Sequence, residues 1–230
     1  MKTIKISFIA LIFLILSCSK DDEPTPAPAP ILDPTSVTDI DGNIYPVLKI
    51  CGKFWMTENL RTTKYNDGGI IPTGLSNTGW AETTTGACAI YGDVVANNII
   101  YGKLYNWYAA NNIKLAPTGW HVASDAEWTS LVECLGGTSI AGGKLKSTSD
   151  LWVAPNTGAT NSSGFNCLPG GFKSYLSASY GLLGSSANFW GSNQRNSTQG
   201  EYLDLRANFA SVSLNGANKT FGYSVRCLKD

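Results

Sequence analysis

A change in apolar spacing near the start of the folded part predicts a β-hairpin. Apolar residues alternate with polar ones after Asn43, and the segments 37–40 and 44–50 are expected to be its strands. Asp41-Gly42 lies between them, and Asp-Gly favours a tight turn because glycine tolerates positive φ. Asp39 and Asp41 could also begin a calcium loop, but the other ligands of an EF-hand are absent, so we favour the turn. A further short strand is expected over 53–56.

A different spacing predicts a helix in the middle of the chain. Ser124 and Glu127 have the spacing of a capping box, in which hydroxyl and carboxylate each satisfy a free backbone N–H at a helix start. Gly136-Gly137 is expected to end the helix. One apolar face follows from residues at i, i+3, i+4 and i+7, namely Trp128, Leu131, Val132 and Leu135.

The rest of the pattern indicates loops and antiparallel strands. Residues 101–111 are expected to form a second short helix, and the Gly-, Thr- and Asn-rich segment 66–95 a long loop. Because no strand is followed by a long helix, a doubly wound fold is disfavoured and we predict an α+β domain. Strands are expected over 164–172, 187–191, 201–206, 210–214 and 222–228.

The first 17 residues differ in composition from all that follows and predict a signal peptide (1–17). Lys2 and Lys5 precede an apolar run over 6–16, which is shorter than the roughly 20 residues needed to span a bilayer. The run Ile15-Leu16-Ser17-Cys18 resembles the lipobox of bacterial lipoproteins, so Cys18 is expected to carry the lipid.

Residues 18–35 are expected to link the anchor to the folded domain, 36–230. The run Pro24-Thr-Pro-Ala-Pro-Ala-Pro30 favours polyproline II, a semi-rigid spacer. The acidic run Ser19-Lys-Asp-Asp-Glu23 resembles the export tag of surface lipoproteins in Bacteroidota. We therefore expect a lipid-anchored outer-membrane protein that faces the cell exterior.

Charge and composition exclude several classes of function. Without the two lysines of the signal peptide the chain has 15 basic and 17 acidic residues, a formal charge of 15 − 17 = −2. No basic run provides the positive field that nucleic acids require, so no nucleic-acid partner is expected. His121 is the single histidine, which excludes sites with paired imidazoles, and we expect neither a metal nor a cofactor.

Ordered motifs over residues 37–230 resemble those of the Fibrobacter succinogenes major paralogous domain, a family of exported bacterial proteins. They are Asp39-Ile-Asp-Gly-Asn-Ile-Tyr45, Trp55-Met-Thr-Glu-Asn-Leu-Arg61, Tyr101-Gly-Lys-Leu-Tyr-Asn-Trp-Tyr108, Gly119-Trp-His-Val122, Asp125-Ala-Glu-Trp128, Leu168-Pro-Gly-Gly-Phe172 and Tyr223-Ser-Val-Arg-Cys227.

The central helix and the last strand also resemble the C-type-lectin-like and formylglycine-generating-enzyme superfamily. This resemblance implies a C-type-lectin-like single domain with two short helices, antiparallel strands and long loops. It also implies a disulfide between a helix cysteine and the last strand, which here would join Cys134 to Cys227. Five cysteines remain besides Cys18, so two bridges can be drawn in about 15 ways. A Cys51–Cys88 bridge is the second candidate, which would leave Cys167 free.

The residues disfavour the chemistry of these relatives but leave sugar binding open. One cysteine in the last 60 residues cannot supply the copper pair of formylglycine-generating enzymes, and His121 is expected to pack near Trp120. Calcium-binding lectin triplets are absent. A metal-free sugar site is possible through an indole ring and neighbouring polar groups, at Asn188, Trp190, Asn193, Gln194 and Arg195.

Three functions stay open at this point. The first is a non-enzymatic binding or adhesion module for a surface glycan or a protein, and we favour it. The second is an enzyme related to formylglycine-generating oxidases with altered chemistry, and the third is a purely structural surface component. Glycoside hydrolysis also stays open, because two acids need only meet in space. The acids available for it are Glu58, Glu82, Asp150, Glu201 and Asp204.

Overall fold

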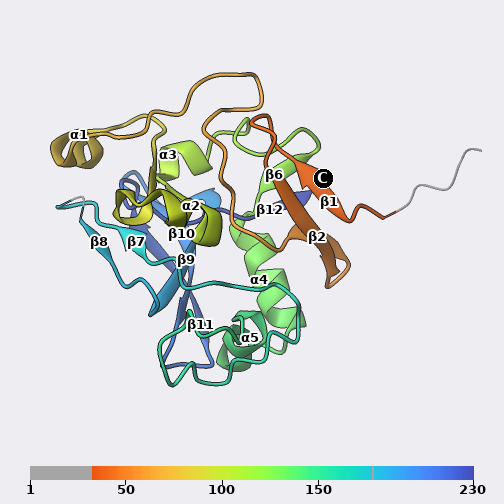
Figure 1. Cartoon of the computed structure of the whole chain (residues 1–230). Coiled ribbons are helices and arrows are strands. Elements are labelled where there is room, and N and C mark those ends of the chain that lie inside the picture. Colours follow the sequence, from red (N-terminus) through yellow and green to blue (C-terminus); the bar gives the residue numbers. More distant parts are fainter. Residues whose placement is uncertain (1–32, 178) are drawn as a thin grey trace, which may run out of the picture. The chain divides into compact units, whose positions relative to one another are not determined.

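The computed structural model describes residues 33–177 and 179–230, and residues 34–230 form one unit. The expected signal peptide, the lipidated Cys18 and most of the linker lie outside the described residues. Within the described part the domain is α+β, and its strand ladders are antiparallel (Figure 1).

A five-stranded sheet joins the two ends of the domain, in the order β1-β2-β3-β12-β6. The predicted hairpin is confirmed, because Asp39 Oδ1 accepts hydrogen bonds from the backbone N–H groups of Asp41 and Asn43, each at 2.9 Å. The predicted strand at 53–56 is confirmed as well. The strands are β1 (Ser36–Thr38), β2 (Ile44–Ile50), β3 (Lys53–Met56), β6 (Trp120–Val122) and β12 (Cys227–Lys229).

A three-stranded sheet in the order β11-β10-β9 forms the second layer. Its strands are β9 (Ser186–Gln194), β10 (Gln199–Arg206) and β11 (Val212–Asn218), which confirm the strands expected at 187–191 and 201–206 and most of that at 210–214. Two short pairs complete the strands, β4 (Cys88–Ile90) with β5 (Lys103–Tyr105) and β7 (Phe172–Lys173) with β8 (Tyr180–Gly181).

Some predicted elements are wrong. Residues 164–171 are irregular, because the chain there only touches its neighbours at isolated bridges. The segment 101–111 is not one helix. Residues 103–105 pair with β4 as strand β5, and a four-residue helix begins only after its cap at Asn106. The segment 66–95 is a long connection, yet it contains a helix and β4.

The expectation of two short helices is also wrong, because the described residues form five α-helices. They are α1 (Asn77–Glu82), α2 (Val95–Tyr101), α3 (Trp107–Ala110), α4 (Asp125–Cys134) and α5 (Thr138–Leu145), and a 3₁₀ turn, η1 (Tyr91–Asp93), precedes α2. None of these helices is long and apolar enough to cross a bilayer.

The central helix α4 is confirmed in detail. Ser124 Oγ accepts from the N–H of Glu127 at 3.3 Å, and Glu127 Oε2 accepts from the N–H of Ser124 at 2.9 Å, so both halves of the capping box are present. The predicted apolar face packs on β9, β10 and β11. Trp128 lies at its centre, 5.0 Å from the Trp55 ring and 5.9 Å from the Phe165 ring. Burying each such ring contributes roughly 2–3 kcal/mol.

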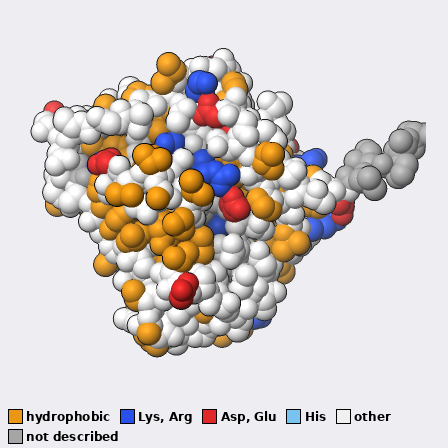
Figure 2. Space-filling view, viewed as in Figure 1, with side chains coloured by type: hydrophobic (Ala, Val, Ile, Leu, Met, Phe, Trp, Pro, Cys, Tyr) orange, Lys and Arg blue, Asp and Glu red, His pale blue; other side chains and the backbone are white. Residues whose placement is uncertain are grey.

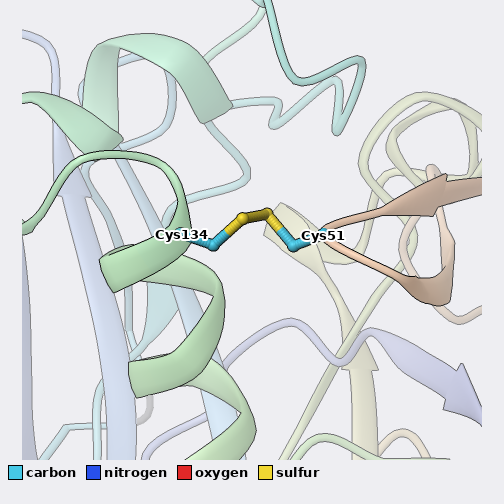
Figure 3. Close-up of a disulfide and its surroundings, with 2 residues drawn as sticks. All are labelled: Cys51 and Cys134. Carbon is cyan, nitrogen blue, oxygen red and sulfur yellow. A yellow bond between two sulfur atoms is a disulfide. The ribbon is translucent and has the colours of Figure 1, made fainter.

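The disulfide connects the β2–β3 turn to the end of α4, through Cys51 and Cys134 (Figure 3). The pairings Cys134–Cys227 and Cys51–Cys88 are therefore wrong. The two Cα atoms of the bridge are 6.2 Å apart, which a disulfide spans readily. Cys227 cannot reach this bridge because it lies in β12, buried in the cluster on the other side of the five-stranded sheet.

Three cysteines stay free among the described residues, and all are buried: Cys88, Cys167 and Cys227. The prediction that Cys167 is free is thus confirmed, but Cys88 and Cys227 are free as well. Burial raises the pKa of Cys88 to about 11 and that of Cys167 to about 12, and it also raises the pKa of Cys227. The thiols are protonated at neutral pH and act as small apolar side chains.

Candidate functional site

A cleft of about 520 Å³ opens over β9, β10 and β11, beside the β7–β8 hairpin. Its lining comes from three parts of the chain: the β7–β8 hairpin with Leu182 after it, the β9–β10–β11 meander and the segment after β11. The lining residues are Phe172, Tyr175, Leu182, Asn188, Thr198, Gln199, Tyr202, Arg206, Gly216, Ala217, Asn218, Phe221 and Tyr223.

Aromatic rings in mutual contact form one wall of the cleft. Phe221 is the centre of this group, with the rings of Phe172 at 5.7 Å, Tyr175 at 4.8 Å and Tyr223 at 5.2 Å. Tyr202 continues the wall, 4.8 Å from Tyr223. Phe172, Tyr175, Tyr202 and Phe221 are each partly exposed, so the wall presents apolar ring surface to a ligand.

Amides and hydroxyls form the other part of the lining. The Asn188 amide is 1% exposed, and its Nδ2 donates to Ser186 Oγ at 3.0 Å, which fixes its orientation at the floor of the cleft. Asn218 is oriented by the turn, because its Oδ1 accepts from the N–H and the hydroxyl of Thr220 at 3.0 and 3.1 Å. An amide provides both donors and acceptors, and of these two side chains Asn218 is the one that is partly exposed to a ligand.

One ion pair lies beside the cleft. Asp204 faces Asn188 across β9 and β10, and its Oδ2 accepts from Arg206 Nε at 2.8 Å. Burial raises the pKa of Asp204, although Arg206 opposes this, and its Oδ1 is buried without a hydrogen-bond partner among the described residues. Burial also raises the pKa of Tyr202 and Tyr223, so both phenols are neutral at physiological pH.

Only one of the predicted sugar-site residues, Asn188, lines this cleft. The structure corrects the prediction for Trp190, which is fully buried: its Nε1 donates to the Tyr105 carbonyl at 2.8 Å and its ring lies 4.5 Å from Tyr223. Trp190 pairs with Tyr202 across β9 and β10, so both side chains lie on the same face of the sheet, where the rings of Tyr202 and Tyr223 cover the indole. The indole supports the aromatic wall from behind and cannot stack on a ligand.

The remaining predicted residues are Asn193 and Gln194 at the end of β9 and Arg195 directly after it, and none of them lines the cleft. Their polar groups serve the fold: Asn193 Oδ1 accepts from the N–H of Asp125 at 2.8 Å, and Gln194 Oε1 accepts from Lys219 Nζ at 2.7 Å. Arg195 pairs with Glu201 at 3.3 Å. These contacts correct the prediction that the three form one site with Trp190.

His121 lies outside the cleft, on β6. Its Nδ1 is 2.6 Å from Asp230 Oδ1 and its Nε2 is 3.0 Å from Glu127 Oε1. The predicted location ahead of α4 is confirmed, but carboxylates rather than an indole engage the ring. Among the described residues no group of three or more His, Cys, Asp or Glu side chains could hold a metal.

A separate apolar surface surrounds α2, where Figure 2 shows hydrophobic side chains gathered on one face. Val95 and Ile99 are one helical turn apart and are 74% and 75% exposed, and Val94 and Ile100 adjoin them. The polar residues of the helix, Asn97 and Asn98, are only partly exposed, and Asn97 Nδ2 donates to the Tyr91 carbonyl at 2.9 Å.

The aromatic wall was not predicted from the sequence, although two of its residues belong to the family motifs quoted above. Phe172 ends Leu168-Pro-Gly-Gly-Phe172 and Tyr223 begins Tyr223-Ser-Val-Arg-Cys227. Tyr175 and Phe221 carry no local signal, because only the approach of the β7–β8 hairpin to the turn after β11 brings them together.

The fold and cleft define a single α+β domain with one aromatic, amide-lined hollow. The family model described as Fibrobacter succinogenes major domain matches residues 48–229. The chain therefore belongs to this family. Comparison with curated proteins and with solved structures finds no match.

Proposed function

We propose that the protein is a lipid-anchored surface protein whose lectin-like domain binds carbohydrate without cleaving it. The observation that supports this is the cleft itself, in which partly exposed rings adjoin fixed amides. Sugar rings have apolar faces that stack on aromatic side chains and hydroxyls that pair with amides. A protein partner is disfavoured because the rings lie in a hollow rather than on a flat surface.

The cleft lining supports binding rather than catalysis. Glycoside hydrolysis in most families requires two carboxyl groups that flank the scissile bond. The residues that line the cleft provide rings, amides, hydroxyls and one guanidinium, and none is an acid. The two candidate acids on β10, Glu201 and Asp204, are three residues apart and so point to opposite faces of the strand.

Glycan binding by the purified full chain tests this proposal. We expect at least one oligosaccharide on an array to bind, with Tyr175→Ala and Phe221→Ala each weakening binding at least tenfold. Phe54→Ala is the matched control, because Phe54 is a partly exposed aromatic residue on β3 outside the cleft lining. Absence of binding to every glycan, with an intact fold by circular dichroism, would contradict the proposal.

The anchor is tested separately, because it concerns residues outside the described part. Cells that express the chain are labelled with a fatty-acid analogue, and we expect the label on the protein to disappear in Cys18→Ala. Protease treatment of intact cells tests surface exposure, and replacement of Asp21, Asp22 and Glu23 by alanine should protect the domain from digestion. Cys88→Ala, which changes a buried thiol, should keep the label.

A further inference from the structure

A second hollow of about 300 Å³ adjoins the cleft, and Leu182 and Arg206 line both. The second hollow has an apolar side formed by Val153, Leu182 and Phe209, which are 47%, 43% and 59% exposed. Ser185 and Asn208 add polar groups to it. The two adjoining hollows, called the groove below, together offer more room than one sugar ring needs, and Arg206 lines both of them.

Among the described residues that line the two hollows, Arg206 is the only one with a charged side chain. Its Nε donates to Asp204 Oδ2 at 2.8 Å, which holds the planar guanidinium in place. Within the described part of the chain the two η nitrogens donate to no other group. The guanidinium is fixed through Nε, and its two η nitrogens can donate a pair of hydrogen bonds to the two oxygens of a carboxylate.

We infer that the ligand is an acidic oligosaccharide, with the carboxylate of a uronic acid paired to Arg206 and neighbouring sugars on the aromatic wall and against Phe209. This rests on the proposed function, since it names the class of glycan. Two observations carry the inference: Arg206 lines both hollows, and its counter-ion Asp204 engages Nε alone, which leaves the two η nitrogens for a ligand carboxylate. The side chain of Arg206 is 37% exposed, so these nitrogens are accessible to a ligand.

The test compares uronate oligomers with their own methyl esters, using the full chain in titration calorimetry. The panel consists of oligomers of galacturonate, mannuronate and glucuronate, and methylation removes the charge but keeps the chain length. We expect at least one acid to bind tenfold or more tightly than its ester. Arg206→Gln should abolish this preference, Arg206→Lys should keep part of it, and the control Arg195→Gln should leave it intact.

Chain length gives an independent readout of the second hollow. We expect Phe209→Ala to weaken binding of a hexamer severalfold but to leave binding of a dimer unchanged, because only the longer chain reaches beyond Arg206. If esters bind as tightly as acids, or if Arg206→Gln keeps the preference, the inference fails. In that case a loss of binding in Phe221→Ala would still support the proposed function, whereas absence of all glycan binding would refute both.

Discussion

Arg226 Nε donates a hydrogen bond to Asn59 Oδ1 at 2.7 Å, across 167 positions of sequence. Arg226 is 1% exposed, and its guanidinium also donates to the Met56 and Phe165 carbonyls at 3.0 and 2.7 Å. Its charged centre lies 4.4 Å from the Phe165 ring centroid. Burial lowers the pKa of Arg226 to about 10, so it stays charged at neutral pH and is satisfied by carbonyls, an amide and aromatic faces.

Removal of this guanidinium should therefore be costly. In Arg226→Met the Asn59 amide oxygen and the carbonyls of Met56 and Phe165 lose their donor, and each buried acceptor left unpaired costs about 1–3 kcal/mol. We expect urea unfolding to show a loss of at least about 3 kcal/mol. Arg195→Met, which removes an exposed arginine from a surface pair, should change stability by less than about 1 kcal/mol. Equal effects of the two substitutions would contradict this account.

Loss of the disulfide should also destabilise the domain strongly. The Cys51–Cys134 bridge closes a loop over a sequence separation of 83, which corresponds to about 4.5 kcal/mol in the chain-entropy model. We expect Cys51→Ala with Cys134→Ala to lose stability of this order in chemical denaturation. Mass spectrometry of an unreduced digest should show one peptide pair joined through these cysteines, and a Cys134–Cys227 pair would refute the assignment.

His121 should make stability depend on pH. Burial would lower its pKa, but hydrogen bonds and charge from Asp230 and Glu127 outweigh it and raise the pKa above 6.5. The favourable contribution of the protonated ring is complete below pH 6.5 and is lost as the pH rises through the folded-state value. Burial would raise the pKa of Glu127, but hydrogen bonds from Ser124 and His121 outweigh burial and lower it below 4.5. The contribution of the Glu127 carboxylate to stability is therefore lost as the pH falls through its folded-state pKa.

The cluster thus contributes most between about pH 4.5 and 6.5. We expect the free energy of unfolding to fall between pH 6 and 8 by no more than about 1 kcal/mol, because the ring is 37% exposed and solvent screens it. His121→Gln should flatten this decline. A wild-type decline that persists unchanged in the variant would show that another group titrates.

Gly200 should tolerate no side chain. A Cβ at this position would overlap the Trp107 indole, which packs against the strand there. We expect Gly200→Ala to cost about 1–3 kcal/mol through overpacking. Gly170→Ala is the matched control, because its Cβ would lie 3.5 Å from Ser224 and Tyr101, an ordinary contact. Thermal unfolding distinguishes the two, and a neutral Gly200→Ala would contradict the packing.

Local chemistry made some elements predictable and tertiary contact hid others. The capping box at Ser124 and the Asp41-Gly42 turn depend on residues within a few positions of each other, so they could be inferred. The helix α5 was missed because Gly142 and Gly143 lower helix propensity. Both are explained only by the fold, since a Cβ at either position would overlap backbone carbonyl groups of residues 210–211 or 158.

The cleft and the disulfide escaped prediction for the same reason. Tyr175 and Phe221 are far apart in the sequence, as are Cys51 and Cys134, and neither pair has a spacing that marks it. The prediction for Trp190 was wrong because the sequence around an aromatic residue in a polar segment does not show whether its side chain faces solvent or the core. The rings of Tyr202 and Tyr223 settle this by covering the indole, and both come from elsewhere in the chain.

The place of β12 has a consequence for how the domain can form. This strand is the last element along the chain, yet it lies inside the five-stranded sheet, between β3 and β6. A chain that emerges from its N-terminus, from a ribosome or a translocation pore, leaves the edges of β3 and β6 open until residues 227–229 arrive. Because Arg226 immediately precedes the strand, the buried donor for Asn59 arrives at the same moment. Closure of the five-stranded sheet therefore requires residues 227–229, and a segment that lacks them has nothing to join β3 to β6.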